Sequence, residues 1–258
     1  MHIPTLAELQ ALPPTDALKG KVILITGAGD GLGKAAALDF SAQGAHVILL
    51  GRNQAKLEAT YDEIEAINQS RPIIFPYDLN TLNPDVAREM AFAIEQEFGR
   101  LDGLLLNAAA LGSKMSIAQY PEQQWLDVIN TNLNSSFYLT KAMLPLLEAS
   151  NAGRLVFTTS SVGRQGRAYW GAYGVSKFAT EGLMQTLAAE LGATTAIRTF
   201  AINPGATRTA MRASAYPGED PKLVPSPAAH MPLYRFLMSD AADDYNGQSI
   251  DAHTYLTD

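Results

Sequence analysis

Short apolar stretches of strand length alternate along most of the chain with longer stretches that have helical spacing. In residues 178–191, Phe178, Leu183, Leu187 and Leu191 recur as they would on one face of a helix. The predicted strands span residues 21–26, 45–51, 72–79, 103–109, 154–160, 197–204 and a weaker segment at 249–253. These strands are apolar throughout, which is typical of a parallel sheet covered on both faces.

The repeated βαβ pattern predicts an α/β fold of the Rossmann type. We expect a doubly wound, mostly parallel seven-stranded sheet with helices on both faces. An N-terminal arm is expected over residues 1–20 and a single domain over 21–258. A polar, proline-containing break at about 206–227 is long for a simple connection, so it predicts a lid over a substrate.

Composition narrows the classes of function. The 258 residues contain no apolar run long enough to span a bilayer, and the first twenty do not resemble a secretory signal. We therefore expect a cytoplasmic protein that does not bind membranes. A net charge of -7 without a basic run argues against a nucleic acid partner. Because the chain has no cysteine, redox chemistry would require a cofactor.

A glycine-rich turn, residues 26–33 with the sequence TGAGDGLG, directly follows the first predicted strand and precedes a helical stretch. Glycines let backbone N–H groups approach a pyrophosphate, and the helix N-terminus attracts its charge. The turn therefore predicts a dinucleotide site, although a plain connection is the alternative. Its expected cofactor contacts are Gly27, Gly29, Asp30, Gly31, Leu32 and Gly33.

The end of the second predicted strand indicates which dinucleotide binds. An NAD site usually carries an acidic residue about 20 residues past the glycines, but here Gly51 stands at that position. Arg52 follows and would bind a 2′-phosphate, which favours NADP(H). NAD(H) remains the alternative, because the glycine turn has no basic residue and Arg52 has a second interpretation as a solvated surface cation.

Two further polar residues follow strands at the same expected edge of the sheet. Asp78 and Asn107, with their neighbours Leu79 and Ala108, are candidates for contacts with the adenine and its ribose. Either polar residue is equally well explained as part of an ordinary turn.

A candidate catalytic group lies beyond the fifth predicted strand. Tyr173 and Lys177 are four residues apart, so on a helix their side chains are adjacent. A lysine cation would stabilise the phenolate of a tyrosine that ordinarily titrates near 10. Ser160 would donate a hydrogen bond to a substrate oxygen on which negative charge develops. A Tyr-x-x-x-Lys pair also occurs by chance, so the combination with the glycine turn is what predicts hydride and proton transfer.

The order and spacing of residues 26–33, Ser160, Tyr173 and Lys177 resemble those of the short-chain dehydrogenase/reductase family over residues 21–253. This resemblance implies an enzyme that moves a hydride between a nicotinamide and a small-molecule carbonyl or secondary alcohol. It implies that Tyr173 is the general acid/base, that Lys177 also holds the nicotinamide ribose, and that Ser160 orients the substrate.

The resemblance implies further site residues. Asn132 would organise a water relay toward the lysine, with Asn130 and Asn134 as rival assignments. The segment 203–209 would position the nicotinamide carboxamide, with contacts from Pro204, Gly205, Thr207 and Thr209.

More narrowly, residues 160–182 and 203–217 resemble a bacterial subgroup, the YciK-type oxidoreductases. The sequence departs from the family at residues 106–109, where Leu-Asn-Ala-Ala replaces the usual Asn-Asn-Ala-Gly. Relatives pack subunits through helices near 121–150 and 170–191, which implies a homodimer or homotetramer. The apolar faces of these helices are also explained by core packing alone.

Several aromatic or flexible side chains are candidates for shaping a substrate pocket, or for simple core packing: Tyr169, Trp170, Met211 and Tyr216. The four histidines, His2, His46, His230 and His253, lack the spacing of a metal site, so no catalytic metal is expected. A competing hypothesis is a sensor or scaffold that binds NADP(H) without turnover. The presence of the serine, the tyrosine and the lysine favours an enzyme.

Overall fold

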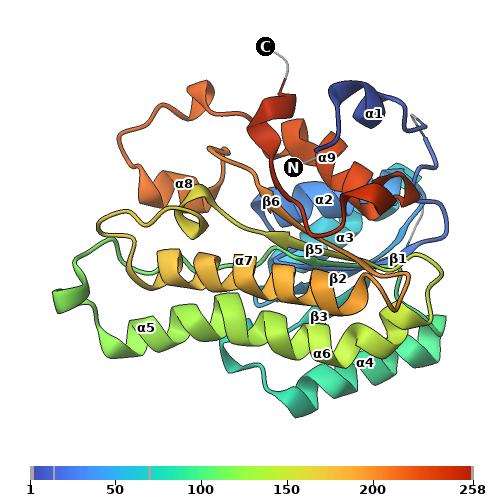
Figure 1. Cartoon of the computed structure of the whole chain (residues 1–258), viewed down its shortest axis with the longest axis horizontal. Helices are drawn as coiled ribbons and strands as arrows, with labels where there is room; N and C mark the ends of the chain where they lie inside the picture. The colour runs from blue at the N-terminus through green and yellow to red at the C-terminus, as the bar shows by residue number, and fades with distance from the viewer. Residues whose placement is uncertain (1–2, 14, 69–70, 257–258) are drawn as a thin grey trace.

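The computed structural model describes residues 3–13, 15–68 and 71–256. Within these residues the strands form one seven-stranded sheet in the order β3-β2-β1-β4-β5-β6-β7, and every neighbouring pair is parallel (Figure 1). The strands are β1 (Val22–Thr26), β2 (His46–Gly51), β3 (Ile73–Pro76), β4 (Gly103–Leu106), β5 (Arg154–Thr158), β6 (Arg198–Asn203) and β7 (Ser249–Asp251). The expected parallel, Rossmann-type sheet is confirmed.

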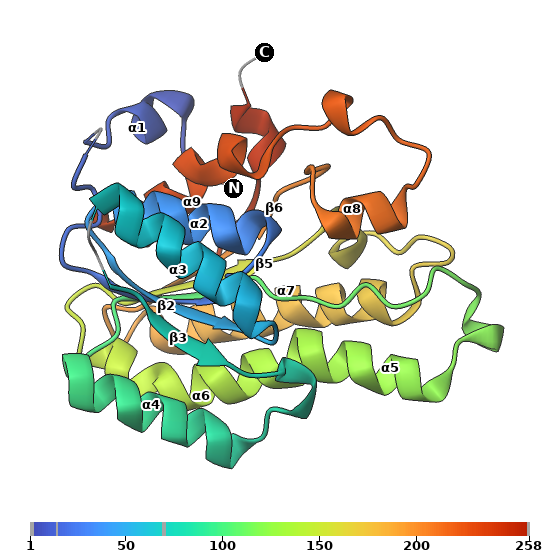
Figure 2. The ribbon, with the colours of Figure 1, turned by 180° about the vertical axis from the view of Figure 1, so that it is seen from behind.

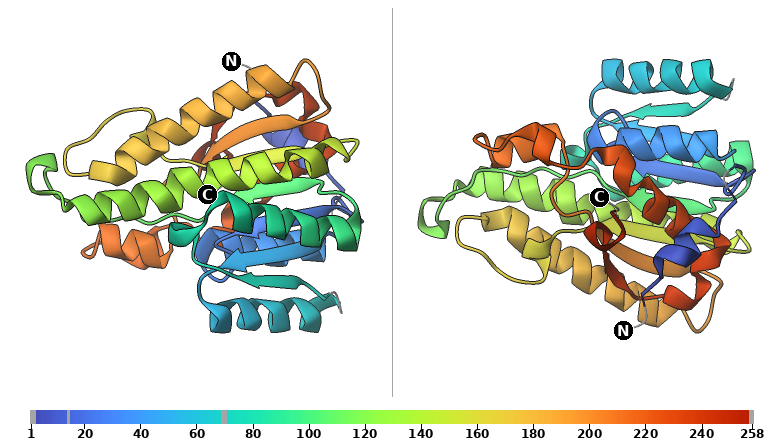
Figure 3. Two further views of the ribbon diagram at one scale, coloured as in Figure 1. Left: turned by 90° about the horizontal axis from the view of Figure 1, so that it is seen from below. Right: turned by 90° about the horizontal axis from the view of Figure 1, so that it is seen from above.

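Helices cover the sheet on both faces, which is why its strands are apolar throughout (Figures 1 and 2). One face carries α2 (Gly31–Ala42), α3 (Gln54–Asn68) and α9 (Met231–Met238). The other carries α4 (Pro84–Phe98), α6 (Ser135–Glu148) and α7 (Gly171–Leu191), with α5 (Glu122–Ile129) leading into α6. Figure 3 shows the two helical layers from below and from above. Each layer encloses its own apolar cluster against the sheet.

The described part of the N-terminal arm packs against the body of the protein. Its short helix α1 (Leu6–Gln10) begins with a capping box between Thr5 and Glu8, and it contacts α9. Leu9 and Leu18 are buried in the apolar cluster under α2 and α9. The division into an arm over 1–20 and a domain over 21–258 stays a prediction. Among the described residues, no helix combines the length and apolar character needed to cross a membrane.

Five of the seven strands, β3 to β7, end earlier than predicted, whereas β1 and β2 end at the predicted residues. The strand predicted over 103–109 ends at Leu106, and the strand predicted over 72–79 ends at Pro76. The residues left over form turns at the edge of the sheet. Because β1 lies between β2 and β4, the chain connections diverge on either side of it, and a crevice opens beyond these carboxyl ends.

Candidate active site

A cleft of about 670 Å³ lies at this edge of the sheet. It is lined by most of the residues that the sequence predicts: Gly27, Gly29, Asp30, Gly31, Leu32, Arg52, Asp78, Leu79, Asn107, Ala108, Ser160, Tyr173, Lys177, Pro204, Gly205, Thr207 and Thr209. The two other candidates, Gly33 and Asn132, are buried and stand behind its wall. Segments that are far apart in the sequence therefore meet at one site.

The glycines of the turn have no room for side chains where β1 passes into α2. Gly27 has a φ of +71°, and a Cβ there would lie 3.1 Å from Ala108 Cα. A Cβ on Gly33 would lie 2.2 Å from the carbonyl oxygen of Gly27. Asp30 caps α2 by accepting a hydrogen bond from the Gly31 amide at 2.7 Å. A bare backbone turn at the N-terminus of a 12-residue helix fits the pyrophosphate of a dinucleotide.

Asn107 connects three strand ends. Its backbone N–H donates to the Thr26 hydroxyl at 2.9 Å, and its side-chain amide donates to the Thr26 carbonyl at 3.2 Å. Its side-chain oxygen accepts a hydrogen bond from the Thr158 hydroxyl at 3.3 Å. These bonds hold the ends of β1, β4 and β5 in register. A direct contact between Asn107 and a cofactor stays a prediction.

The wall beside β2 and β3 carries the other candidate contacts for the adenosine. Asp78 caps a short turn by accepting a hydrogen bond from the Asn80 amide at 3.0 Å, and Leu79 is buried behind it. Arg52 is exposed and lines the cleft next to Gly51. Lys56, which sequence reasoning missed, lines the same wall. Its place in the first turn of the helical stretch that follows Arg52 is the signal that points to it.

Tyr173 and Lys177 lie on the first turns of α7, and both are buried. Lys177 Nζ stands 5.6 Å from the centroid of the Tyr173 ring. It donates a hydrogen bond to the carbonyl oxygen of Thr158, the last residue of β5, at 2.7 Å. The Ser160 hydroxyl lies close enough to the Tyr173 phenol to lower its pKa. The three predicted catalytic side chains thus share one end of the cleft.

Burial controls the ionisation of this group. It raises the pKa of Tyr173 to about 12, although the Ser160 hydroxyl acts in the opposite direction. It lowers the pKa of Lys177 to about 8, and the carboxylate of Glu181 opposes that shift. The sequence suggests a tyrosine pKa lowered by the lysine. The structure differs because desolvation dominates and the lysine bonds to a main-chain carbonyl. Tyr173 is therefore a neutral phenol at physiological pH.

Asn132 lies in a π-helical segment, η3 (Asn130–Asn134), that interrupts the passage from α5 to α6. Its side chain accepts from the Ala110 amide at 2.7 Å and donates to the Ala110 carbonyl at 3.0 Å and to the Ser176 hydroxyl at 2.9 Å. Ser176 in turn donates to the carbonyl of Tyr173 at 2.8 Å. The rival candidates, Asn134 and Asn130, hydrogen-bond to each other at 2.8 Å. Of the three asparagines, Asn132 is the one bonded toward the catalytic helix.

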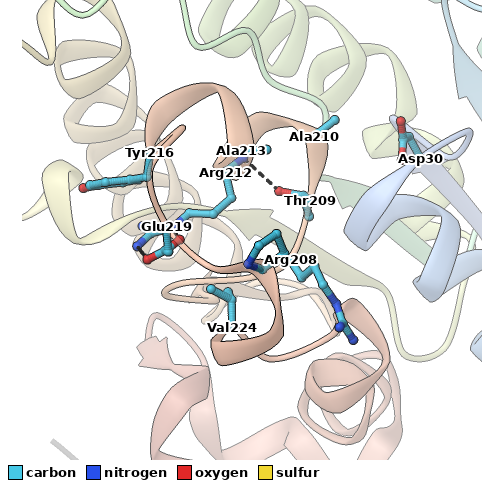
Figure 4. A pocket seen from close by; sticks show the side chains of 10 residues that line it. Asp30, Arg208, Thr209, Ala210, Arg212, Ala213, Tyr216, Glu219 and Val224 are labelled. Carbon is cyan, nitrogen blue, oxygen red and sulfur yellow. Dashed lines mark hydrogen bonds and ion pairs between the residues drawn. The ribbon is translucent and has the colours of Figure 1, made fainter.

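The segment predicted as a lid, residues 206–227, contains the short helix α8 (Ala210–Ala215). Arg212 makes a two-pronged ion pair with Glu219, at 2.7 and 2.6 Å, and lies 3.7 Å over the ring of Tyr216. A smaller cavity of about 330 Å³ lies between this segment and Asp30. In Figure 4, Asp30 and Tyr216 lie on opposite sides of this cavity. The ion pair thus ties α8 to the chain that follows it.

Three of the four pocket candidates line the cleft, namely Trp170, Met211 and Tyr216. The ring of Trp170 lies 5.7 Å from that of Tyr173 and 6.2 Å from that of Tyr216. Lys114 reaches across from the segment after β4, donates to the Ala215 carbonyl at 3.0 Å and lies over the rings of Trp170 and Tyr216. Tyr169 is 62% exposed and lies outside this wall.

None of the described histidines lines the cleft. His46 stacks near Phe98, and buried His230 is hydrogen-bonded to Thr207 at 3.0 Å. Burial lowers the pKa of His230 to about 4, so it is neutral. His2 lies outside the described residues. Within the described ranges, no three His, Asp or Glu side chains are grouped to hold a metal ion.

A family model for short chain dehydrogenases matches residues 21–220 of the chain. The chain belongs to the short chain dehydrogenase family. It is an NAD(P)-dependent short-chain dehydrogenase/reductase. The family resemblance inferred from the glycine turn and the Tyr-Lys pair is thereby confirmed.

This short chain dehydrogenase is 49% identical over 240 residues to the oxidoreductase YciK of Escherichia coli K12, covering 93% of this chain and 94% of the relative. It is similar to the structure of a short chain dehydrogenase from Pseudomonas syringae, with a TM-score of 0.90, 51% identity, and coverage of 92% and 96% of the two chains. A short chain dehydrogenase of Escherichia coli CFT073, crystallised as a complex with NADPH, has a TM-score of 0.89 and 48% identity, with coverage of 93% and 99%.

Proposed function

We propose that this short chain dehydrogenase transfers a hydride between NADP(H) and a carbonyl or secondary alcohol substrate, with Tyr173 as the general acid/base. One observation carries the proposal. The phenol of Tyr173, the hydroxyl of Ser160 and the ammonium group of Lys177 lie at one end of a cleft that also contains the glycine turn.

The residues along the cleft fit a bound dinucleotide, whose nicotinamide supplies or accepts the hydride. The glycine turn would hold the pyrophosphate, and Arg52 the 2′-phosphate. Asp78, Leu79, Asn107 and Ala108 would contact the adenosine. Lys177 and the residues Pro204, Gly205, Thr207 and Thr209 would hold the nicotinamide end. NADP(H) is supported by Gly51, which offers no carboxylate, and by the NADPH complex of the Escherichia coli CFT073 relative. NAD(H) is the alternative.

The chain's own residues supply the proton. In carbonyl reduction, the neutral Tyr173 phenol donates its proton to the carbonyl oxygen as the hydride adds to the carbon, which gives the alcohol. Ser160 donates a hydrogen bond to the same oxygen and stabilises its developing charge. The nearby Lys177 cation stabilises the phenolate that remains. Alcohol oxidation runs these proton steps in reverse.

Asn132 serves this site indirectly in our proposal. Through Ala110 and Ser176 it holds the segment after β4 and the start of α7 in place. It would also organise the water relay that returns a proton toward Lys177. π-helical segments are frequent at functional sites, which supports this role.

The experiment combines the purified protein with NADPH and a panel of diketones, quinones, aldehydes and keto acids, with absorbance followed at 340 nm. We expect oxidation of NADPH with at least one carbonyl compound. Tyr173→Phe should abolish this turnover while the NADPH Kd changes little. Tight NADPH binding without oxidation of any substrate, unaltered in Tyr173→Phe, would instead identify a sensor or scaffold.

We also propose an assembly of two or four copies in the cytoplasm. Exposed apolar side chains on α5, α6 and α7 support the assembly: Leu126, Phe137, Val175 and Phe178.

A further inference from the structure

Lys56 reaches from the first turn of α3 to the glycine turn. Its Nζ pairs with the carboxylate of Asp30 at 2.5 Å, and each of the two side chains is 54% exposed. The Asn53 side chain accepts a hydrogen bond from the Lys56 amide at 3.0 Å and so fixes the start of this turn of helix. A Cβ added to Gly29 would lie 2.9 Å from Lys56 Cβ, which shows how closely the lysine stem packs on the glycine turn.

The glycine turn and the wall beside it carry charges of both signs. The glycine turn carries no cation of its own, and its one charged side chain is the acidic Asp30. A carboxylate beside a phosphate dianion is repulsive. Asp30 and Lys56 line the cleft together with Arg52, so the charge of the acid is offset at the place where Arg52 would meet a 2′-phosphate.

We propose that Lys56 is the second cation of the 2′-phosphate subsite and that the Asp30–Lys56 pair sets the preference for NADP(H) over NAD(H). Lys56 supplies the positive charge that the glycine turn lacks. Its ammonium group has three N–H donors, so it can donate a hydrogen bond to a phosphate oxygen as well as to Asp30. Asp30 holds Lys56 against the turn but also competes with the phosphate for it. The inference rests on the proposed function, which assigns the 2′-phosphate to Arg52.

The test measures the Kd of NADPH and of NADH separately, by fluorescence titration, for the wild type and four variants. Lys56→Gln should weaken NADPH about tenfold, since a charge-assisted hydrogen bond is lost, and should change the NADH Kd less than about twofold. Asp30→Asn keeps a good helix cap and removes the competing charge. It should tighten NADPH binding several-fold and NADH binding by clearly less than that.

Lys34→Gln is the matched control. Lys34 forms an ion pair with Glu63 at 2.7 Å, close to the glycine turn but outside the lining of the cleft. Its removal should leave the ratio of the two Kd values unchanged. Lys56→Arg, which keeps the charge, should restore most of the NADPH preference. Circular dichroism, together with the NADH Kd, shows that each variant is folded.

Two results would overturn the inference. One is an equal loss of NADPH and NADH affinity in Lys56→Gln, and the other is a weaker NADPH affinity in Asp30→Asn. Either result, in a protein whose wild type binds NADPH and reduces a carbonyl, leaves the proposed function standing. A wild type that binds neither nucleotide overturns both.

Discussion

Lys177 Nζ donates a hydrogen bond to the carbonyl oxygen of Thr158 at 2.7 Å, and the lysine is only 3% exposed. A lysine at this depth loses most of its hydration, and one main-chain carbonyl does not replace it. Such a residue destabilises the folded chain in its charged form. We attribute its presence to chemistry rather than to stability.

Replacing Lys177 with methionine should therefore stabilise the fold and abolish the reaction. The folded pKa of about 8 lies below the usual 10.5, so between these values the unfolded chain binds more protons and wild-type stability rises with pH. The stabilisation by Lys177→Met is thus largest below pH 8 and fades toward pH 10.5. We expect a melting temperature higher by roughly 2–6 °C at pH 7. Activity should fall about 100-fold or more. Thermal unfolding followed at several pH values checks this, and an unchanged or lower Tm at pH 7 would contradict it.

The rate of carbonyl reduction should fall as Lys177 loses its proton. Tyr173, with a pKa of about 12, keeps its proton throughout this range. The descending limb of kcat/KM against pH should therefore lie near pH 8, where the lysine titrates. Lys177→Arg keeps the charge at all these pH values and should move the limb upward. A limb that stays in place in that variant would show that another group controls it.

Asn132→Ala should damage both stability and turnover. The substitution leaves the Ala110 amide and carbonyl without their buried partner, at a cost of about 2–4 kcal/mol in the free energy of unfolding. It should lower kcat more than it changes the NADPH Kd. Asn134→Ala, which removes a hydrogen bond to Asn130 alone, is the control and should cost about 1 kcal/mol or less. Urea unfolding and steady-state kinetics distinguish the two variants, and equal effects would count against the role of Asn132.

Gly33→Ala should weaken cofactor binding at the glycine turn. The added Cβ would meet the Gly27 carbonyl at 2.2 Å, so the turn must shift. We expect the NADPH Kd to rise at least about tenfold, which corresponds to the loss of one charge-assisted hydrogen bond. Gly182→Ala is the control, because nothing lies within 4 Å of the added Cβ and the site is helical. It should stabilise the protein by about 0.5–1 kcal/mol. Isothermal titration with NADPH separates these outcomes, and an unchanged Kd in Gly33→Ala would contradict the assignment of the turn.

Local pattern was enough to predict the strands, the glycine turn and the adjacency of Tyr173 and Lys177. Each of these depends on the spacing of neighbouring residues, which the backbone geometry converts directly into structure. The strand ends were less well predicted, because residues such as Asn107 bond to other strands and leave the ladder after Leu106.

Features that depend on distant partners could not be read from the sequence. Asp30 and Lys56 are 26 residues apart and meet only because α3 packs against the glycine turn. The bonds of Asn132 to Ala110 and Ser176 depend on a π-helical segment that has no sequence signal of its own. The direction of the Tyr173 pKa shift was missed because the helical spacing says nothing about burial.

The most direct test of the account follows the hydride itself. NADPH carrying deuterium at one or the other C4 position is mixed with a carbonyl compound that the protein reduces, and the alcohol is analysed by mass spectrometry. We predict that one of the two labelled forms transfers its deuterium to the carbinol carbon. Tyr173→Phe should form this product far more slowly than the wild type. Consumption of NADPH without label in the alcohol, or labelled product formed equally fast by Tyr173→Phe, would contradict the account.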